Sequence, residues 1–147
     1  MAWTAGIVLS DDERWIRCFF PEAASNYDVV GIARVGKEYH AHRCSENDML
    51  FGVVDENTGN SETGVSAHAW GYVQTDGACT VKAQGPIDSG GYVDAVLHEN
   101  YGVASGDNGP TALTFAVTTA ALSNVMGTVA VTLNSQIYRQ HDGLIGG

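Results

Sequence analysis

The feature that most constrains this chain is the close spacing of turn-forming residues between short strand-forming segments. Segments rich in Val, Ile, Thr, Tyr and Phe are repeatedly interrupted by Gly, Asn and Asp, and the chain has 18 glycines but only 3 prolines. β-Branched and aromatic residues favour strands, whereas Gly, Asn and Asp accept the backbone conformations of tight hairpin corners. The pattern predicts an all-β fold, namely a small single-domain β-barrel or sandwich of short antiparallel strands with glycine-rich turns.

The strand-forming segments follow one another along the whole chain. We predict strands at 5–9, 14–20, 27–35, 37–44, 49–55, 66–75, 78–84, 91–97, 101–105, 111–120, 127–134 and 136–140. In "GTVAVTLN", alternation puts Val129, Val131 and Leu133 on one face of a strand. Segment 118–126, "TTAALSNVM", contains helix-forming Ala and Leu, but the β-branched residues around it favour a segment without helix.

Four clusters of turn-forming residues separate these strands. They are "ENTGN" at 56–60, "TDG" at 75–77, "DSGG" at 88–91 and "SGDNGP" at 105–110. Each predicts the corner of a hairpin, because its residues accept the backbone angles of tight turns.

The length and composition fit a single globular domain. The chain has 147 residues, of which 44% are hydrophobic and 16% charged. A chain of this size buries a core without disulfides, so we expect one β domain over 1–147. The three cysteines (Cys18, Cys44 and Cys79) include no C-x-x-C pair, and we expect free, buried thiols.

The net charge of −10 argues against two classes of partner. Binding to phosphates requires clustered Lys and Arg, which no part of the chain supplies, so no nucleic acid and no anionic membrane is expected. No apolar run approaches the roughly 20 residues of a membrane span. The opening "MAWTAGIVLSDDERW" lacks the basic start and long apolar run of a secretory signal, which predicts a soluble protein that is not exported by that route.

The string "DSGG" at 88–91 also surrounds the nucleophile of chymotrypsin-like proteases. Such a serine needs a histidine base and an aspartate from distant parts of the chain. The nearest upstream histidine, His68, precedes Ser89 by only 21 residues. We therefore predict a turn, with Ser89 facing solvent and with Gly90 and Gly91 supplying positive φ angles, and we expect no catalytic residue there.

A second candidate site lies in "GKEYHAHRCSENDMLFG", which resembles the first metal motif of cupins: a glycine, H-x-H, a glutamate and a closing glycine. On a strand, His40 and His42 project to the same face, and two imidazoles with a carboxylate from Glu46 form a common metal-binding set. The second cupin motif is missing. We therefore predict no metal ligand and no cofactor, with a cupin-like metal-dependent enzyme as an alternative.

The middle of the chain, from Met49 to Gly106, resembles small β-barrel modules of phage virion proteins. In those modules a "GVV" strand precedes a strand of the type G-x-C-x-V-K-x-x-G-x-I, and "GVA" follows. The corresponding residues here are Gly77, Cys79, Val81, Lys82, Gly85, Ile87, Gly90, Val93, Gly102, Val103 and Ala104, while Gly91 stands where Asp is usual. Such modules occur in capsid decoration (cement) proteins and at the ends of tail fibres and spikes.

Aromatic residues gather near the start of the chain. Trp3, Trp15, Phe19 and Phe20 supply more aromatic area than one thin barrel edge readily hides, and aromatic side chains are favoured as interface anchors. We predict that these four residues contact a partner protein, with residues 1–25 as an interface arm, although core packing would account for at least half of them.

Together these observations predict a non-catalytic phage structural protein that binds the outer capsid surface and stabilises the shell. The resemblance implies the major capsid protein and further copies of this chain, as a homotrimer, as partners. It also implies assembly in the host cytoplasm and a place on the capsid surface of the virion. The alternatives are a tail fibre, spike or baseplate component, the cupin-like enzyme, and a carbohydrate-binding β-sandwich with Trp70 and Tyr72 as a stacking platform.

Overall fold

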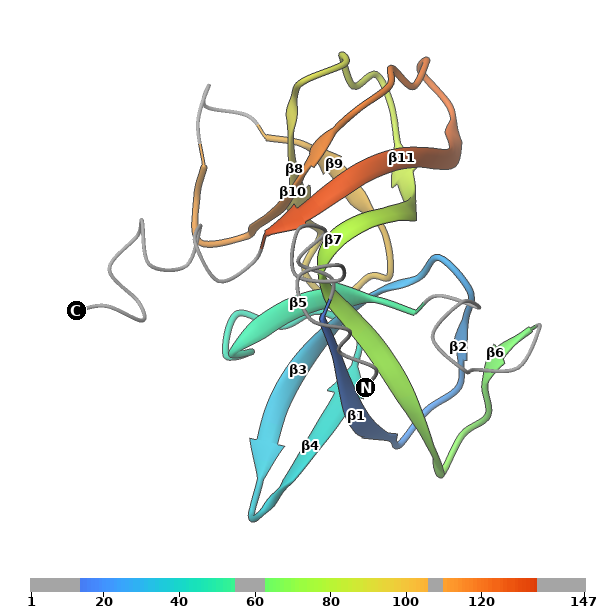
Figure 1. Cartoon of the computed structure of the whole chain (residues 1–147), viewed down its shortest axis with the longest axis vertical. Helices are drawn as coiled ribbons and strands as arrows, with labels where there is room; N and C mark the ends of the chain where they lie inside the picture. The colour runs from blue at the N-terminus through green and yellow to red at the C-terminus, as the bar shows by residue number, and fades with distance from the viewer. Residues whose placement is uncertain (1–13, 55–62, 106–109, 135–147) are drawn as a thin grey trace, which may run out of the picture.

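The computed structural model describes residues 14–54, 63–105 and 110–134. The described part is built of strands and contains no helix, which confirms the predicted all-β class (Figure 1). The strands are β1 (Arg14–Phe20), β2 (Ala24–Ser25), β3 (Val29–Val35), β4 (Glu38–His42), β5 (Leu50–Val53), β6 (Gly64–Val65), β7 (Ala69–Gln84), β8 (Tyr92–Ala95), β9 (Gly102–Ala104), β10 (Thr114–Thr118) and β11 (Met126–Asn134). Within these residues there is no helix that is long and apolar enough to cross a bilayer.

The main sheet closes into two rings that share one strand. Its order is β1-β4-β3-β5-β7-β11-β10-β8-β9, and β7 pairs additionally with β1 and with β9. The first ring, or N-terminal barrel, consists of β1, β4, β3, β5 and the beginning of β7. The second, or C-terminal barrel, consists of the end of β7 with β11, β10, β8 and β9. In Figure 1, β7 runs as a bent green ribbon from one ring into the other.

The continuity of β7 contradicts the turn predicted at 75–77. Strand β1 pairs with β7 from Ala69 to Asp76, and β11 pairs with it from Asp76 to Gln84. Pairing on both sides of Asp76 holds the chain extended through "TDG", so the segments predicted as separate strands form one. Gly77 has a φ of 91°. Glycine adopts this angle readily because it has no Cβ, and the strand bends here between the two barrels without reversing its direction.

Buried apolar side chains form two clusters. The cluster of the N-terminal barrel consists of Cys18, Phe20, Val30, Ile32, Ala41, Val54, Val65 and Val73. The larger cluster fills the C-terminal barrel and also takes in residues of β3 and β5, including Val29, Phe51 and Val53. Val129, Val131 and Leu133 all belong to it, which confirms the face predicted for β11.

The cysteines lie where the fold buries small apolar side chains. Cys18 and Cys44 are buried free thiols, as predicted, and burial raises the pKa of each to about 12. Cys79 is likewise not in a disulfide, but it is only half-buried.

Most predicted strands in the described range are present, and the differences are local. The two-residue strands β2 and β6 were not predicted, because so short a segment carries no alternation. Segment 118–126 forms no helix, as its sequence indicated. Leu122 forms an isolated β-bridge with Ile87. The predicted strands 5–9 and 136–140, the turn at 56–60 and most of the turn at 105–110 lie outside the described residues.

Candidate functional site

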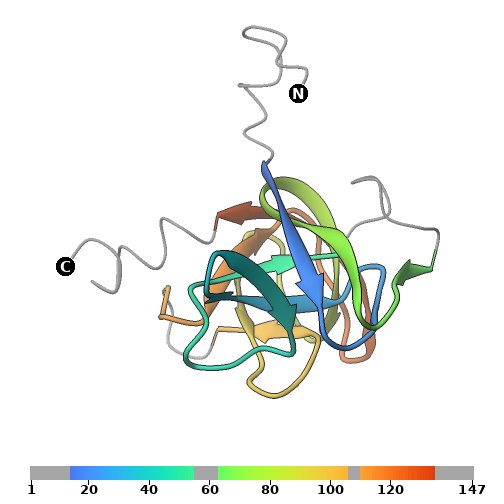
Figure 2. The ribbon, with the colours of Figure 1, turned by 90° about the horizontal axis from the view of Figure 1, so that it is seen from below.

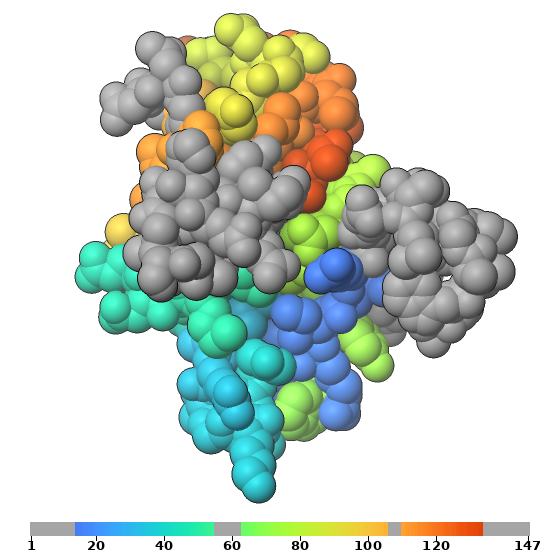
Figure 3. Space-filling model, turned by 60° about the vertical axis from the view of Figure 1, so that its left-hand side comes forward, coloured from blue at the N-terminus to red at the C-terminus, as the bar shows by residue number. Residues whose placement is uncertain are grey.

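Four aromatic side chains gather on the outer surface of the N-terminal barrel. Trp15 and Phe19 come from β1, and Trp70 and Tyr72 come from β7. The two strands are antiparallel, with Phe19 opposite Trp70 and with Arg17 opposite Tyr72. These four residues and Arg17 are called the aromatic face below. β1 lies beside β7 in Figure 2 and reaches the surface next to the hairpin of β3 and β4 in Figure 3.

Strand alternation explains why these side chains point outward. In β1, Cys18 and Phe20 point into the core, so the odd-numbered residues of the strand point to solvent. In β7, Gly71 and Val73 are buried, which turns Trp70 and Tyr72 outward. Trp15, Trp70 and Tyr72 remain 45%, 40% and 39% exposed, respectively. Such exposure is high for large aromatic side chains, which normally bury most of their area.

Contacts between the side chains order the aromatic face. The rings of Phe19 and Trp70 meet edge to face, with their centroids 5.6 Å apart. The guanidinium of Arg17 lies over the Trp70 ring, 4.4 Å from its centroid. The rings of His40, on β4, and of His68, which directly precedes β7, also lie near Phe19, with centroids 5.2 Å and 6.4 Å away. Edge-to-face pairs and cation–π contacts each contribute on the order of 0.5–1 kcal/mol, so the face is partly preorganised.

The structure separates the four residues predicted as interface anchors. Trp15 and Phe19 lie on the aromatic face, whereas Trp3 lies outside the described residues. Phe20 is fully buried in the core of the N-terminal barrel. Its prediction as an interface residue is wrong, because its position in β1 alternates with Phe19 and points inward. Residues 14–20 and 24–25 of the predicted interface arm are strands of the fold.

The pairing of β1 with β7 is the part of this site that sequence reasoning missed. Trp70 and Tyr72 do share one exposed face, as expected for a strand. The sequence, however, contains no signal that this face adjoins Trp15 and Phe19, because the two strands are far apart along the chain.

Ser89 lies in the turn between β7 and β8. Gly90 has a φ of 81°, and its N–H donates to the carbonyl of Thr118 at 2.9 Å. The N–H of Gly91 donates to the carbonyl of Asp88, which closes the turn. Ser89 itself is exposed, as predicted, but Gly91 lacks the predicted positive φ. His68 directly precedes β7 and Ser89 follows its far end, so the length of the strand separates them.

The cupin-like residues take other partners. The Nε2 atom of His40 lies 3.3 Å from Oε1 of Glu38, and that of His42 lies 2.9 Å from Oδ1 of Asp48. Glu46 lies in the exposed turn beyond β4. Among the residues that the structure describes, no group of three His, Cys, Asp or Glu side chains is placed to hold a metal ion.

His42 and Asp48 form the most enclosed ion pair of the N-terminal barrel. The Asp48 side chain is only 1% exposed, and its second oxygen accepts the N–H of Ser45 at 2.7 Å. The Nδ1 atom of His42 lies 2.8 Å from the carbonyl of Arg43. Because a carbonyl and a carboxylate both accept hydrogen bonds, this arrangement favours the imidazolium form, in which each ring nitrogen carries a proton. The hydrogen bond to Asp48 accordingly raises the pKa of His42 above 6.5.

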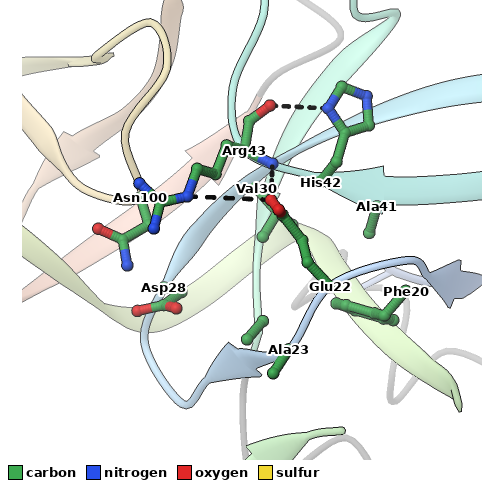
Figure 4. Close-up of a pocket in the computed structure, with 10 residues that line it drawn as sticks. Phe20, Glu22, Ala23, Asp28, Val30, Ala41, His42, Arg43 and Asn100 are labelled. Carbon is green, nitrogen blue, oxygen red and sulfur yellow. Dashed lines mark hydrogen bonds and ion pairs between the residues drawn. The ribbon is translucent and has the colours of Figure 1, made fainter. Parts of the chain in front are cut away.

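A small pocket lies next to this pair (Figure 4). Its lining includes Phe20, Glu22, Ala23, Ala24, Asp28, Val30, Ala41, His42, Arg43 and Asn100. Its volume is about 30 Å³. That is room for one or two water molecules, far below the roughly 300–1,000 Å³ of ligand-binding sites. The aromatic face is therefore the stronger candidate for a functional surface.

Comparisons with known proteins point to one fold. No family model matches the chain. No curated protein sequence matches it either. Among solved structures, the chain is similar to the N base of the head fiber gp8.5 of bacteriophage phi29, with a TM-score of 0.50 and 12% sequence identity. The match covers 83% of this chain and 94% of that one. At this identity the likeness shows a shared fold.

Proposed function

We propose that this chain is a non-catalytic structural protein of a bacteriophage virion that binds the outer surface of the capsid. The observation that supports this most is the shared fold with the base of a phage head fiber, over nearly all of that base. The resemblance of residues 49–106 to β-barrel modules of phage virion proteins rests on the sequence alone and supports the same proposal. A decoration protein and the base of a head fiber are both parts of a phage head.

The aromatic face supports a role in attachment. Trp, Tyr and Arg are the residue types that most often dominate the binding energy of protein interfaces. Three of the aromatic side chains stay about two-fifths exposed on the isolated chain. A partner that covers them would gain the hydrophobic free energy that folding leaves unused. The expected partners are the major capsid protein and other copies of this chain in a trimer.

A tail fibre, spike or baseplate component is the second candidate, since the structural neighbour is itself part of a fiber. The cupin-like enzyme has less support, because His40 and His42 pair with Glu38 and Asp48 and not with each other and Glu46.

Binding to particles tests the proposal. Purified full chain is added to capsid particles that were assembled without it, and cosedimentation and cryo-EM are measured. We expect saturable binding and new density on the outside of the shell. Density confined to the tail would instead support the fibre or baseplate candidate, and the absence of binding to shell and tail alike would overturn the proposal.

A further inference from the structure

Arg17 differs from Arg43 and Lys82, whose charges are paired with carboxylates. Arg43 lies 3.9 Å from carboxylate oxygens of both Glu22 and Glu99, and Lys82 pairs with Asp28. In the described part of the chain, no carboxylate pairs with Arg17. Its guanidinium is stacked on Trp70, its diagonal neighbour across the two strands. Stacking occupies the flat side of the guanidinium and leaves the N–H groups along its edge available, in a geometry that matches a carboxylate.

The distribution of charge favours this barrel over the C-terminal one as the place for an acidic partner. The described Lys and Arg residues are Arg14, Arg17, Arg34, Lys37, Arg43 and Lys82. From residue 83 to residue 134 the chain has no Lys or Arg but four acidic residues, namely Asp88, Asp94, Glu99 and Asp107. The C-terminal part would therefore repel an acidic surface, whereas the described residues from 14 to 82 balance these six cations with six carboxylates (Glu22, Asp28, Glu38, Glu46, Asp48 and Asp76) and would repel it less.

The exposed area suits the anchor of an interface. Three side chains at 39–45% exposure leave on the order of 200 Å² of aromatic surface uncovered, since each presents about 150–250 Å². A stable interface covers about 800 Å² on each partner. The aromatic face would thus be the central part of a larger contact, surrounded by neighbouring polar groups.

We propose that the aromatic face is the contact with the capsid, and that it receives an acidic protein segment whose carboxylate pairs with the edge of Arg17. This inference rests on the function proposed above and adds the chemistry of the partner. The segment would place an Asp or Glu side chain against Arg17 and an apolar side chain between Trp15 and Tyr72.

The geometry favours a protein over a glycan. The face lies on the outside of a closed barrel, and the rings of Phe19 and Trp70 are inclined at 66° to each other. Small ligands and sugars bind preferentially in concave sites. The pocket beside His42 is lined by none of the five residues of the face.

The experiment compares variants of the full chain for binding to capsid particles assembled without it. Arg17→Ala and Trp70→Ala remove the two stacked partners. Arg34→Ala and Tyr39→Ala are matched controls, because both residues are exposed on the same barrel but lie outside the face. Arg17→Lys keeps the charge but loses the planar edge. Thermal unfolding of each variant establishes that it is folded.

Arg17→Ala and Trp70→Ala should each weaken the apparent Kd at least about tenfold, and the controls less than about twofold. Arg17→Lys should lose most of the same affinity. The double variant should lose less than the product of the single losses, because Trp70 positions Arg17. If the unmodified chain binds and the face variants bind equally well, this inference fails while the proposed function stands. If periodate oxidation of particle glycans abolishes binding, the partner is a glycan and the inference is also overturned.

Discussion

Asp48 illustrates, at the scale of single residues, how a carboxylate is kept inside this fold. Oxygens of its side chain accept hydrogen bonds from the His42 ring and from the Ser45 backbone, so the buried charge is compensated. A Cβ at position 31 would lie within 1.6 Å of an Asp48 oxygen, so Gly31 leaves the space that the carboxylate occupies. The loop after β4 is fixed to the barrel by these contacts.

This ion pair predicts a dependence of stability on pH. In the folded chain the pKa of His42 lies above its ordinary value of 6.5, mainly because of the hydrogen bond to Asp48. Because the pKa is higher in the folded state, the stabilisation by the ion pair is complete below pH 6.5 and is lost as the pH rises through the folded-state pKa. His42→Gln should lower the free energy of unfolding by roughly 1–3 kcal/mol at low pH and by less at high pH. Urea unfolding of both proteins, from about pH 5 to about pH 9, measures the difference. A difference that stays constant across this range would contradict the assignment.

Strand β1 shows, at the scale of elements, how one segment serves two purposes. Its inward side chains belong to the core of the N-terminal barrel and its outward side chains form half of the aromatic face. The two groups of side chains are separated only by the alternation along a strand, which has a period of two residues. Neighbouring aromatic residues in the sequence therefore have opposite environments.

Two substitutions in β1 test this division. Phe20→Ala should lower the free energy of unfolding by about 3–5 kcal/mol, because it leaves a cavity in a closed core. Trp15→Ala should lower it by less than about 1 kcal/mol, because the indole is half exposed and outside the core. Urea unfolding monitored by far-UV circular dichroism gives both values. Equal losses would mean that the face is part of the folded core.

Local patterns predicted the strands well, and the alternation of β11 predicted its buried face. Alternation in "RWIRCFF" could likewise have predicted that Phe20 points inward. Two features depend on contacts between distant segments and left no local signal. The first is the pairing of β1 with β7, which assembles the candidate site. The second is the extended path through "TDG", where strands on both sides of β7 override the turn preference of the residues.

The whole molecule is organised around β7, which belongs to both barrels. Disruption of one ring removes hydrogen bonds from the strand that completes the other. Because Val73 and Val81 of this strand point into different core clusters, each core depends on the same backbone. We therefore expect the two barrels to unfold together, as one cooperative unit.

Tryptophan fluorescence can test this coupling, since both described tryptophans, Trp15 and Trp70, lie in the N-terminal barrel. Val131→Ala removes buried volume from the C-terminal barrel and should cost about 2 kcal/mol. The melting temperature should fall by about 4–8 °C. The same fall should appear in fluorescence and in far-UV circular dichroism. A fluorescence midpoint that stays in place while the circular dichroism midpoint falls would show two independent units.

Ring closure also decides how copies of this chain can meet. A strand at an open sheet edge offers unpaired N–H and C=O groups, on which another chain can add a strand and start a polymer. Among the described strands of the main sheet, each ring closes on itself, and the separate sheet of β2 and β6 is only two residues long. The backbone is therefore a poor template for the addition of strands from other chains, even at a high local concentration of copies. Recognition between molecules is left to side chains, so that a few substitutions on the surface can change the choice of neighbour without disturbing the barrel.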